Sequence, residues 1–229
     1  MTTVLLVRHG LTSANTGGTL AGWTPGVHLA PKGEEQVKAL ASRLASVPVT
    51  AIVSSPLERC QETAAALAAG RGKLVIDTDE RIGECHYGDW QGKPLKTLAK
   101  DPLWKVVQAH PSAAQFPGGE ALRDTQSRAV AAVRHHNARL GSDATWIAVS
   151  HGDVIKAILA DALGVHLDEF QRIVVDPASV SVVTYTELRP FVVRMNDIGG
   201  DVAGLIPPKK GRPKRSSDAA VGGGAGGGK

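Results

Sequence analysis

The sequence is poor in cysteine and in aromatic residues. It has two cysteines, Cys60 and Cys85, in 229 residues, and aromatic residues make up only 4% of the chain. Two cysteines in a chain of this length do not form a disulfide framework, so we expect a reduced environment. With few aromatic side chains available, Leu, Val, Ile and Ala must fill the core, and a hydrophobic content of 42% is sufficient for one.

Long apolar runs are also absent. No run reaches the roughly 18 to 20 residues that a membrane-spanning helix needs. The apolar run at residues 4–7, close to Met1, is too short to be the core of a signal peptide. These absences predict a cytoplasmic protein without a membrane partner.

The net charge of +4 does not describe the part of the chain that we expect to fold. Six Lys and Arg residues but only one acidic residue lie in the segment 207–229, which leaves 20 basic and 21 acidic side chains in residues 1–206, a net charge of −1. The high isoelectric point therefore gives no reason to expect nucleic-acid binding by residues 1–206. The segment 207–229 is rich in Pro, Lys, Arg, Ser and Gly, which predicts a disordered basic tail after a single domain.

Short apolar runs alternate with segments of helical periodicity. We expect strands at residues 4–7, 51–54, 74–76, 146–149, 180–185 and 191–193, and helices at residues 32–46, 56–69, 121–140 and 154–163. The second of these helices has Ser55 and Pro56 at its start, a pattern typical of an N-cap followed by the first helical residue. The alternation predicts an α/β fold with a mostly parallel sheet that is covered on both faces.

Residues 83–119 interrupt this alternation. The segment holds four prolines, at positions 94, 102, 111 and 117. Long excursions in compact domains are usually binding loops or lids. We therefore expect an irregular cap over one end of the sheet.

Basic side chains follow three of the predicted strands. Arg8-His9-Gly10 follows the first strand, Ser150-His151-Gly152 follows the fourth, and Arg59 lies in the first turn of the helix after the second. The carboxyl ends of parallel strands meet at one edge of a sheet, so these side chains should converge there.

Two Arg and two His side chains, together with helix N-termini, form a site for a tetrahedral dianion. Gly10 and Gly152 would let the backbone approach such a ligand closely. A neutral histidine is a competent nucleophile near neutral pH. The pattern therefore predicts that the chain binds a phosphoryl group and attacks it with histidine.

The complete set of motifs resembles the histidine phosphatase superfamily, in its phosphoglycerate-mutase-like branch. The matching stretches are Leu5-Leu6-Val7-Arg8-His9-Gly10, Ser54-Ser55-Pro56-Leu57-Glu58-Arg59, Glu84-Cys85-His86-Tyr87-Gly88-Asp89-Trp90 and Val149-Ser150-His151-Gly152. The resemblance implies a three-layer α/β/α sandwich with a phosphohistidine formed on His9. It also implies that Arg8, Arg59 and His151 hold the phosphoryl group.

The resemblance assigns further residues to the site. It implies that Asn15 donates a hydrogen bond to the phosphoryl group and that Glu84 acts as general acid and then as general base. Gly22, in the turn Ala21-Gly22-Trp23, and Tyr87 match positions of the substrate site. No cofactor is implied, and the histidines show no metal-ligand spacing, so we expect catalysis without a metal.

The superfamily includes both phosphatases and mutases, and the sequence favours a phosphatase. Mutases that resemble this chain have Arg directly after the acid/base Glu, where this chain has Cys85, and carry an arginine pair on the excursion, where residues 103–119 have none. The stretch Phe116-Pro117-Gly118-Gly119-Glu120 is similar to that of the phosphatases. Tyr87 and the turn around Gly22 are shared with mutases, so phosphoryl transfer within a sugar acid stays open as an alternative, as does a non-catalytic member.

The expected substrate is a small phosphorylated metabolite, which the sequence does not identify. Residues 209–215 contain a Gly-Arg-Pro core with basic flanks, which resembles a minor-groove hook. One hook offers few phosphate contacts, so we favour a tail without a specific nucleic-acid partner. Homodimers are common in the family, and no apolar stripe in the sequence decides whether this chain forms one.

Overall fold

One six-stranded sheet organises the chain. The computed structural model describes residues 1–72, 74–200 and 221–223. The strands lie in the order β3-β2-β4-β1-β5-β6. Their bounds are Thr2–Arg8 for β1, Ala51–Ser54 for β2, Ile76–Thr78 for β3, Thr145–Ser150 for β4, Val180–Tyr185 for β5 and Pro190–Asp197 for β6. Strands β1 to β4 are parallel, whereas β5 is antiparallel to β1 and β6 is antiparallel to β5.

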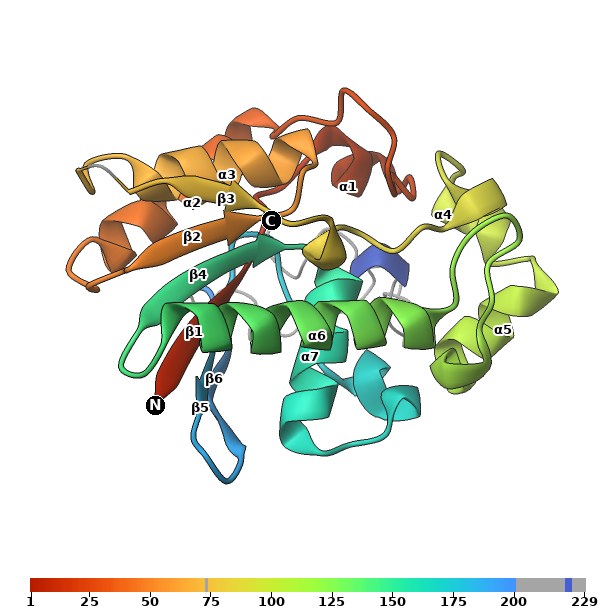
Figure 1. The fold of residues 1–229 in the computed structure, drawn as a ribbon. Coiled ribbons are helices and arrows are strands. Elements are labelled where there is room, and N and C mark those ends of the chain that lie inside the picture. Colours follow the sequence, from red (N-terminus) through yellow and green to blue (C-terminus); the bar gives the residue numbers. More distant parts are fainter. Residues whose placement is uncertain (73, 201–220, 224–229) are drawn as a thin grey trace.

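Helices cover both faces of the sheet (Figure 1). One face carries α2 (Pro31–Leu44) and α3 (Glu58–Ala68), and the other carries α6 (Leu122–Leu140) and α7 (Gly152–Leu163). Alternate residues of β1 face opposite sides, so Leu5 joins the core beneath α2 and α3, whereas Leu6 joins the core beneath α6 and α7. The predicted three-layer α/β/α sandwich with a mostly parallel sheet is confirmed.

The predicted excursion at 83–119 is more regular than expected. It contains α4 (Leu95–Leu98), α5 (Pro102–Ala109) and two 3-10 turns, Gly88–Trp90 and Pro111–Ala113. Proline starts α5 instead of excluding a helix, and the Asp101 side chain accepts from the Leu103 amide at 2.9 Å to cap it. Together with α1 (Ser13–Gly17), α4 and α5 lie beyond the carboxyl ends of the parallel strands (Figure 1).

The C-terminal segment differs from its prediction at three residues. Of the predicted tail 207–229, residues 207–220 and 224–229 lie outside the described residues, and so does the basic segment 209–215. Residues Val221–Gly223 form a tight turn around a left-handed Gly222, and Val221 is 1% exposed and belongs to the core. The composition of the segment did not predict this turn, because the turn is held by a single buried side chain, Val221, and by the backbone N–H and C=O groups of Gly222.

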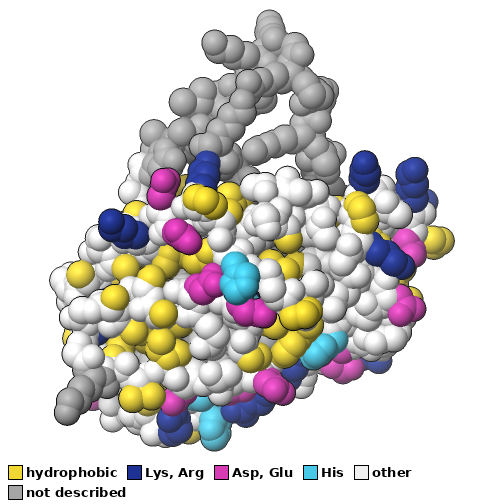
Figure 2. All heavy atoms as spheres, turned by 90° about the horizontal axis from the view of Figure 1, so that it is seen from above, with side chains coloured by type: hydrophobic (Ala, Val, Ile, Leu, Met, Phe, Trp, Pro, Cys, Tyr) yellow, Lys and Arg dark blue, Asp and Glu magenta, His cyan; other side chains and the backbone are white. Residues whose placement is uncertain are grey.

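Charges of both signs are mixed on the surface. Seen from above, Lys and Arg side chains are interspersed with Asp and Glu on the visible face (Figure 2), as the near-neutral charge of residues 1–206 leads one to expect. In the part of the chain that the structure describes, no helix combines the length and apolarity needed to cross a membrane.

Two glycines bring the end of β1 against the start of α2. A Cβ added at Gly33 would lie 2.1 Å from the carbonyl oxygen of Leu11, and one added at Gly10 would lie 2.7 Å from the carbonyl oxygen of Gly33. The Leu11 carbonyl also accepts from the Ala30 amide at 2.9 Å. This contact fixes the loop that follows His9.

We predict that Gly33→Ala destabilises the protein although Ala is the better helix former. The new methyl group meets backbone that cannot move away, so the free energy of unfolding should fall by about 1 to 3 kcal/mol in a urea titration followed by tryptophan fluorescence. The control is Gly17→Ala, because a Cβ there meets no atom closer than 4.0 Å. If Gly33→Ala and the control unfold at the same urea concentration, the close contact is wrong.

Candidate active site

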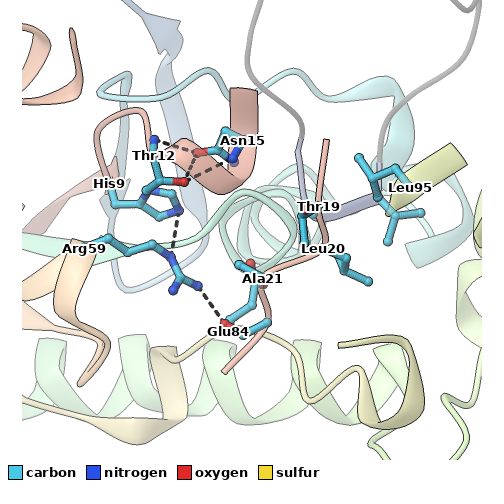
Figure 3. Close-up of a pocket in the computed structure, with 12 residues that line it drawn as sticks. His9, Thr12, Asn15, Thr19, Leu20, Ala21, Arg59, Glu84 and Leu95 are labelled. Atoms are coloured by element: carbon cyan, nitrogen blue, oxygen red, sulfur yellow. Dashed lines mark hydrogen bonds between the residues drawn. The ribbon is translucent and has the colours of Figure 1, made fainter. Parts of the chain in front are cut away.

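His9, Arg59 and His151 meet at the carboxyl edge of the sheet, although they are far apart in sequence. His9 follows β1, His151 is the N-cap of α7 and Arg59 lies in the first turn of α3. Arg59 Nε lies 3.4 Å from His9 Nε2, and Arg59 Nη2 lies 3.2 Å from His151 Nδ1. The two imidazole rings are 5.3 Å apart, edge to face. The predicted convergence of these three side chains is therefore present in the structure. Figure 3 shows His9 and Arg59 facing each other.

The protonation of His9 suits a nucleophile. Its Nδ1 lies 2.8 Å from the Gly10 carbonyl oxygen, which can only accept, so Nδ1 carries the proton and Nε2 keeps its lone pair. Burial, followed by the charges of Arg59 and Arg8, holds the pKa of His9 well below its usual value. His9 is therefore neutral near neutral pH, with Nε2 directed toward Arg59.

His151 is fixed in the opposite tautomer. Arg59 can only donate, so the Nδ1 of His151 accepts and its Nε2 donates to Ser55 Oγ at 2.8 Å. Burial and then the charge of Arg59 hold the pKa of His151 well below its usual value. Ser55 is not the predicted cap of α3, because the helix begins later, at Glu58, with Leu57 as its N-cap and no side-chain cap. Ser55 Oγ accepts from the Leu57 amide at 3.3 Å, ahead of the helix.

Arg59 has one donor that the protein leaves unused. Its Nη2 donates to the Gly22 carbonyl oxygen at 2.9 Å, whereas its buried Nη1 has no hydrogen-bond partner among the described residues. The side chain is 2% exposed, so water does not compensate for the missing bond. A buried guanidinium donor without a partner marks the place of an anionic oxygen.

A small pocket opens beside these groups. Its volume is about 20 Å³, and it is lined by His9, Thr12, Asn15, Thr19, Leu20, Ala21, Gly22, Arg59, Glu84, Leu95, Val221 and Gly222. Asn15 Oδ1 accepts from the Thr12 backbone amide and hydroxyl, which leaves the Asn15 amide nitrogen as the donor for a ligand. Figure 3 shows Asn15, His9 and Arg59 around the same space.

Glu84 reaches the pocket from the segment that follows β3. Its Oε1 accepts from the Cys85 amide at 3.0 Å and from the Tyr87 hydroxyl at 3.3 Å, and its Oε2 lies 3.8 Å from His151 Nδ1. Burial and then the carboxylate of Asp153 raise the pKa of Glu84 to about 7. Near neutral pH the carboxyl group can therefore both give and take a proton, as an acid/base catalyst must.

Five predicted site residues, Arg8, His151, Tyr87, Gly10 and Gly152, lie outside the lining of the pocket. His151 contacts the lining residue Arg59, as described above. Arg8 is buried and donates from Nη1 to the Val175 carbonyl oxygen at 2.8 Å. Tyr87 lies behind Glu84, and its hydroxyl bonds to it. Gly10 packs on α2 and Gly152 is the buried first residue of α7, so neither glycine touches the pocket that it was predicted to help form.

Sequence reasoning missed Asp153. It lies in the first turn of α7, 1% exposed, and accepts from the Tyr87 hydroxyl at 2.9 Å, while Lys156 lies 3.4 Å away. Two signals were available: an acidic residue directly after Ser150-His151-Gly152 and a Lys three residues further on. Val221 and Gly222 were missed as well, and no motif in the sequence singles them out as part of the pocket.

Metal ligands do not gather at this site. In residues 1–72, 74–200 and 221–223, no group of three or more His, Cys, Asp or Glu side chains could hold a metal ion. Among the described residues that line the pocket, the positive charge available to an anion is that of Arg59.

Comparison with known proteins identifies the family. The model of the histidine phosphatase superfamily (branch 1) matches residues 4–198, and the chain belongs to this superfamily. A protein named phosphoserine phosphatase 1 from Hydrogenobacter thermophilus is 30% identical over 86% of this chain and 92% of its own. A glucosyl-3-phosphoglycerate phosphatase from Mycolicibacterium vanbaalenii is 33% identical over 73% of this chain and 76% of its own.

Mutase names also occur among the relatives. A probable phosphoglycerate mutase GpmB from Yersinia enterocolitica is 30% identical over 91% of this chain and 97% of its own.

Among solved structures, YhfR from Bacillus stearothermophilus superposes with a TM-score of 0.81 and 31% identity, over 87% of this chain and 98% of that one. The predicted membership of the superfamily is confirmed.

We predict that Asp153→Asn lowers the pKa of Glu84. Asp153 carries a like charge that disfavours the Glu84 carboxylate, so its removal lets Glu84 lose its proton at a lower pH than about 7. A carbon-13 NMR titration of the Glu84 carboxyl group measures the shift without any substrate. Asp161→Asn, at the far end of α7, is the control and should leave that titration unchanged. An unchanged Glu84 pKa in Asp153→Asn would mean that Asp153 does not govern it.

Proposed function

We propose that the protein hydrolyses small phosphomonoesters through a phosphohistidine on His9, without a metal ion. The observation that carries the proposal is the unpartnered, buried Nη1 of Arg59, in the same side chain whose Nε faces the lone pair of a neutral His9. A phosphoryl oxygen bonded to that nitrogen would bring the phosphorus atom within reach of His9 Nε2. The names of the two phosphatase relatives support the same reaction class.

In the first step, the lone pair of His9 Nε2 forms a bond to phosphorus while the ester P–O bond breaks. The electron pair of that bond goes to the leaving oxygen, which takes the proton of the Glu84 carboxyl group. Arg59 neutralises charge on the transferring group, with Asn15 as a further donor. The products are an alcohol, phosphohistidine and the Glu84 carboxylate.

In the second step, water attacks the phosphorus atom and the P–N bond breaks. Glu84, now a carboxylate, takes a proton from the water, and the electron pair returns to His9 Nε2. Inorganic phosphate leaves, and both residues regain their first protonation states. A pKa of about 7 for Glu84 suits a group that must act in both directions.

Hydrolysis is favoured over mutase chemistry because the pocket offers no second cation. Arg59 is the one Lys or Arg among the residues that line the pocket in the described part of the chain. Cys85, which stands where related mutases have Arg, is buried in the core. A mutase must hold a second anionic group of its substrate while the phosphoryl group is on histidine, and Arg59 is already committed to the phosphate.

The product of 3-phosphoglycerate tests this choice. Inorganic phosphate should form faster than 2-phosphoglycerate, because an intermediate without a second cation leaves before the phosphoryl group returns to it. Both products are measured in one phosphorus-31 NMR assay, with and without a metal chelator. Interconversion that outruns phosphate release would make the protein a mutase, and activity lost with chelator and restored by a divalent ion would refute metal independence.

We predict that His9→Ala abolishes phosphate release and the phosphorylated intermediate. Rapid acid-free quenching followed by peptide mass spectrometry should find an acid-labile phosphoryl group on His9 in the unchanged protein. The matched control is His135→Ala on the exposed side of α6, which should retain turnover. An adduct on another residue, or turnover by His9→Ala, would contradict the proposed nucleophile.

The two roles of Glu84 can be separated by the leaving group. Glu84→Gln should lower the turnover of alkyl phosphates by about 10² to 10⁴-fold, because the alkoxide needs a proton. The phosphorylation step with p-nitrophenyl phosphate, whose anion leaves unprotonated, should change much less in a burst measurement. Glu80→Gln, on an exposed residue of the preceding turn, is the control. Equal losses in the phosphorylation step of both substrates would rule out the acid role.

A further inference from the structure

Residues distant from every sequence motif complete the pocket. The turn Val221–Gly223 lies next to α7, on the side of the molecule that carries α4 (Figure 1). Val221 is 1% exposed and packs in the same core as Leu20 and Tyr87. Val221 and Gly222 both line the pocket that holds His9 and Arg59.

Two buried charged groups anchor the backbone of Gly222. Its amide donates to Asp153 Oδ2 at 2.8 Å, and its carbonyl oxygen lies 3.4 Å from Arg8 Nη2. Asp153 and Arg8 are 1% and 0% exposed, so each gains from a polar partner that does not come from water. The turn is therefore held through the two peptide units that flank Gly222, one by an acceptor and the other by a donor.

Glycine is strongly favoured at position 222. Its φ of +74° lies in the left-handed region, and a Cβ would come within 2.9 Å of Leu20 Cδ1. An alanine at this position has to move the turn, Leu20 or both. The substitution Gly222→Ala therefore disturbs the turn by adding a single methyl group.

The turn leaves little space for a substrate. A pocket volume of about 20 Å³ exceeds only slightly the roughly 10 to 15 Å³ that one water molecule needs. A phosphoryl group and its leaving group are several times larger than one water. His9 follows β1, Arg59 lies on α3 and His151 begins α7. Of the residues that line the pocket, Val221 and Gly222 are the most distant from these elements in the sequence.

We propose that Val221 and Gly222 form a displaceable wall of the substrate pocket, anchored on Asp153 and Arg8, which limits the size of the leaving group. The proposal rests on the proposed function and adds to it the residues that select the substrate. A small leaving group fits beside the docked wall after a slight shift. A bulky leaving group must displace the turn and break both anchoring bonds, so its transition state is reached at a higher cost.

The experiment compares two aryl phosphates whose leaving groups depart as stable anions but differ in size, p-nitrophenyl phosphate and 4-methylumbelliferyl phosphate. In full-length Val221→Ala and Gly222→Ala, kcat/KM for the larger substrate should rise relative to the smaller by about 10-fold. The controls are Val133→Ala, which trims a buried valine of α6, and Gly141→Ala, whose φ of +79° is similar but where a Cβ meets no atom within 4 Å. If both pocket variants keep the ratio of the unchanged protein, the wall is refuted.

Binding separates a failure of this proposal from a failure of the proposed function. Calorimetry with phenylphosphonate and a naphthylphosphonate, neither of which can be hydrolysed, measures size selection without turnover. The two pocket variants should gain about 10-fold in affinity for the larger phosphonate relative to the smaller, and the controls should not. If the two pocket variants show the expected size selection in binding but no ester releases phosphate, the proposed function is refuted and the proposed wall stands. Unchanged selection in binding would refute the wall whether or not the protein is a phosphatase.

Discussion

The site depends on one buried guanidinium group. Arg59 contacts His9 after β1, His151 after β4 and the Gly22 carbonyl oxygen beyond α1. Its charge helps to keep both imidazoles neutral, which makes one of them a nucleophile and fixes the other as an acceptor toward Arg59. Burying such a charge is costly unless its donors are satisfied, and Nη1 is not satisfied by the described residues. The fold thus holds a cation in the position where a phosphoryl group would complete its hydrogen bonds.

Two buried carboxyl groups lie close to the two buried arginines. Glu84 and Asp153 are both nearly inaccessible to solvent, and their mutual repulsion adds to burial in keeping a proton on Glu84 up to a pH of about 7. The Tyr87 hydroxyl lies between the two carboxyl groups, 2.9 Å from Asp153 Oδ2 and 3.3 Å from Glu84 Oε1. Asp153 also accepts from the Gly222 amide, so the group that tunes the acid is the group that anchors the C-terminal turn. The acidity of Glu84 and the closure of the pocket are therefore linked through one carboxylate.

The sequence was most informative where one local pattern decides the outcome. The strands β2 and β5 have the predicted bounds, and the residues after β1 and β4 converge as expected, because parallel strands end at one edge. The failures arose where tertiary contacts override local preference. Helix α3 begins at Glu58 and not at Pro56, so Ser55 is not its cap and bonds instead to His151 and to the Leu57 amide. Gly10 packs against α2 outside the lining of the pocket. Asp153 and Val221 could not be assigned because their partners lie far away in sequence.

The central claim is a double displacement at phosphorus through His9. The most direct measurement is the stereochemistry of hydrolysis, followed with a phosphomonoester made chiral at phosphorus by oxygen isotopes and sulfur. Attack by histidine inverts the phosphorus atom once and attack by water inverts it again, so the account predicts that the released thiophosphate retains its configuration. Net inversion would show that water attacks the substrate directly, and would contradict the phosphohistidine intermediate.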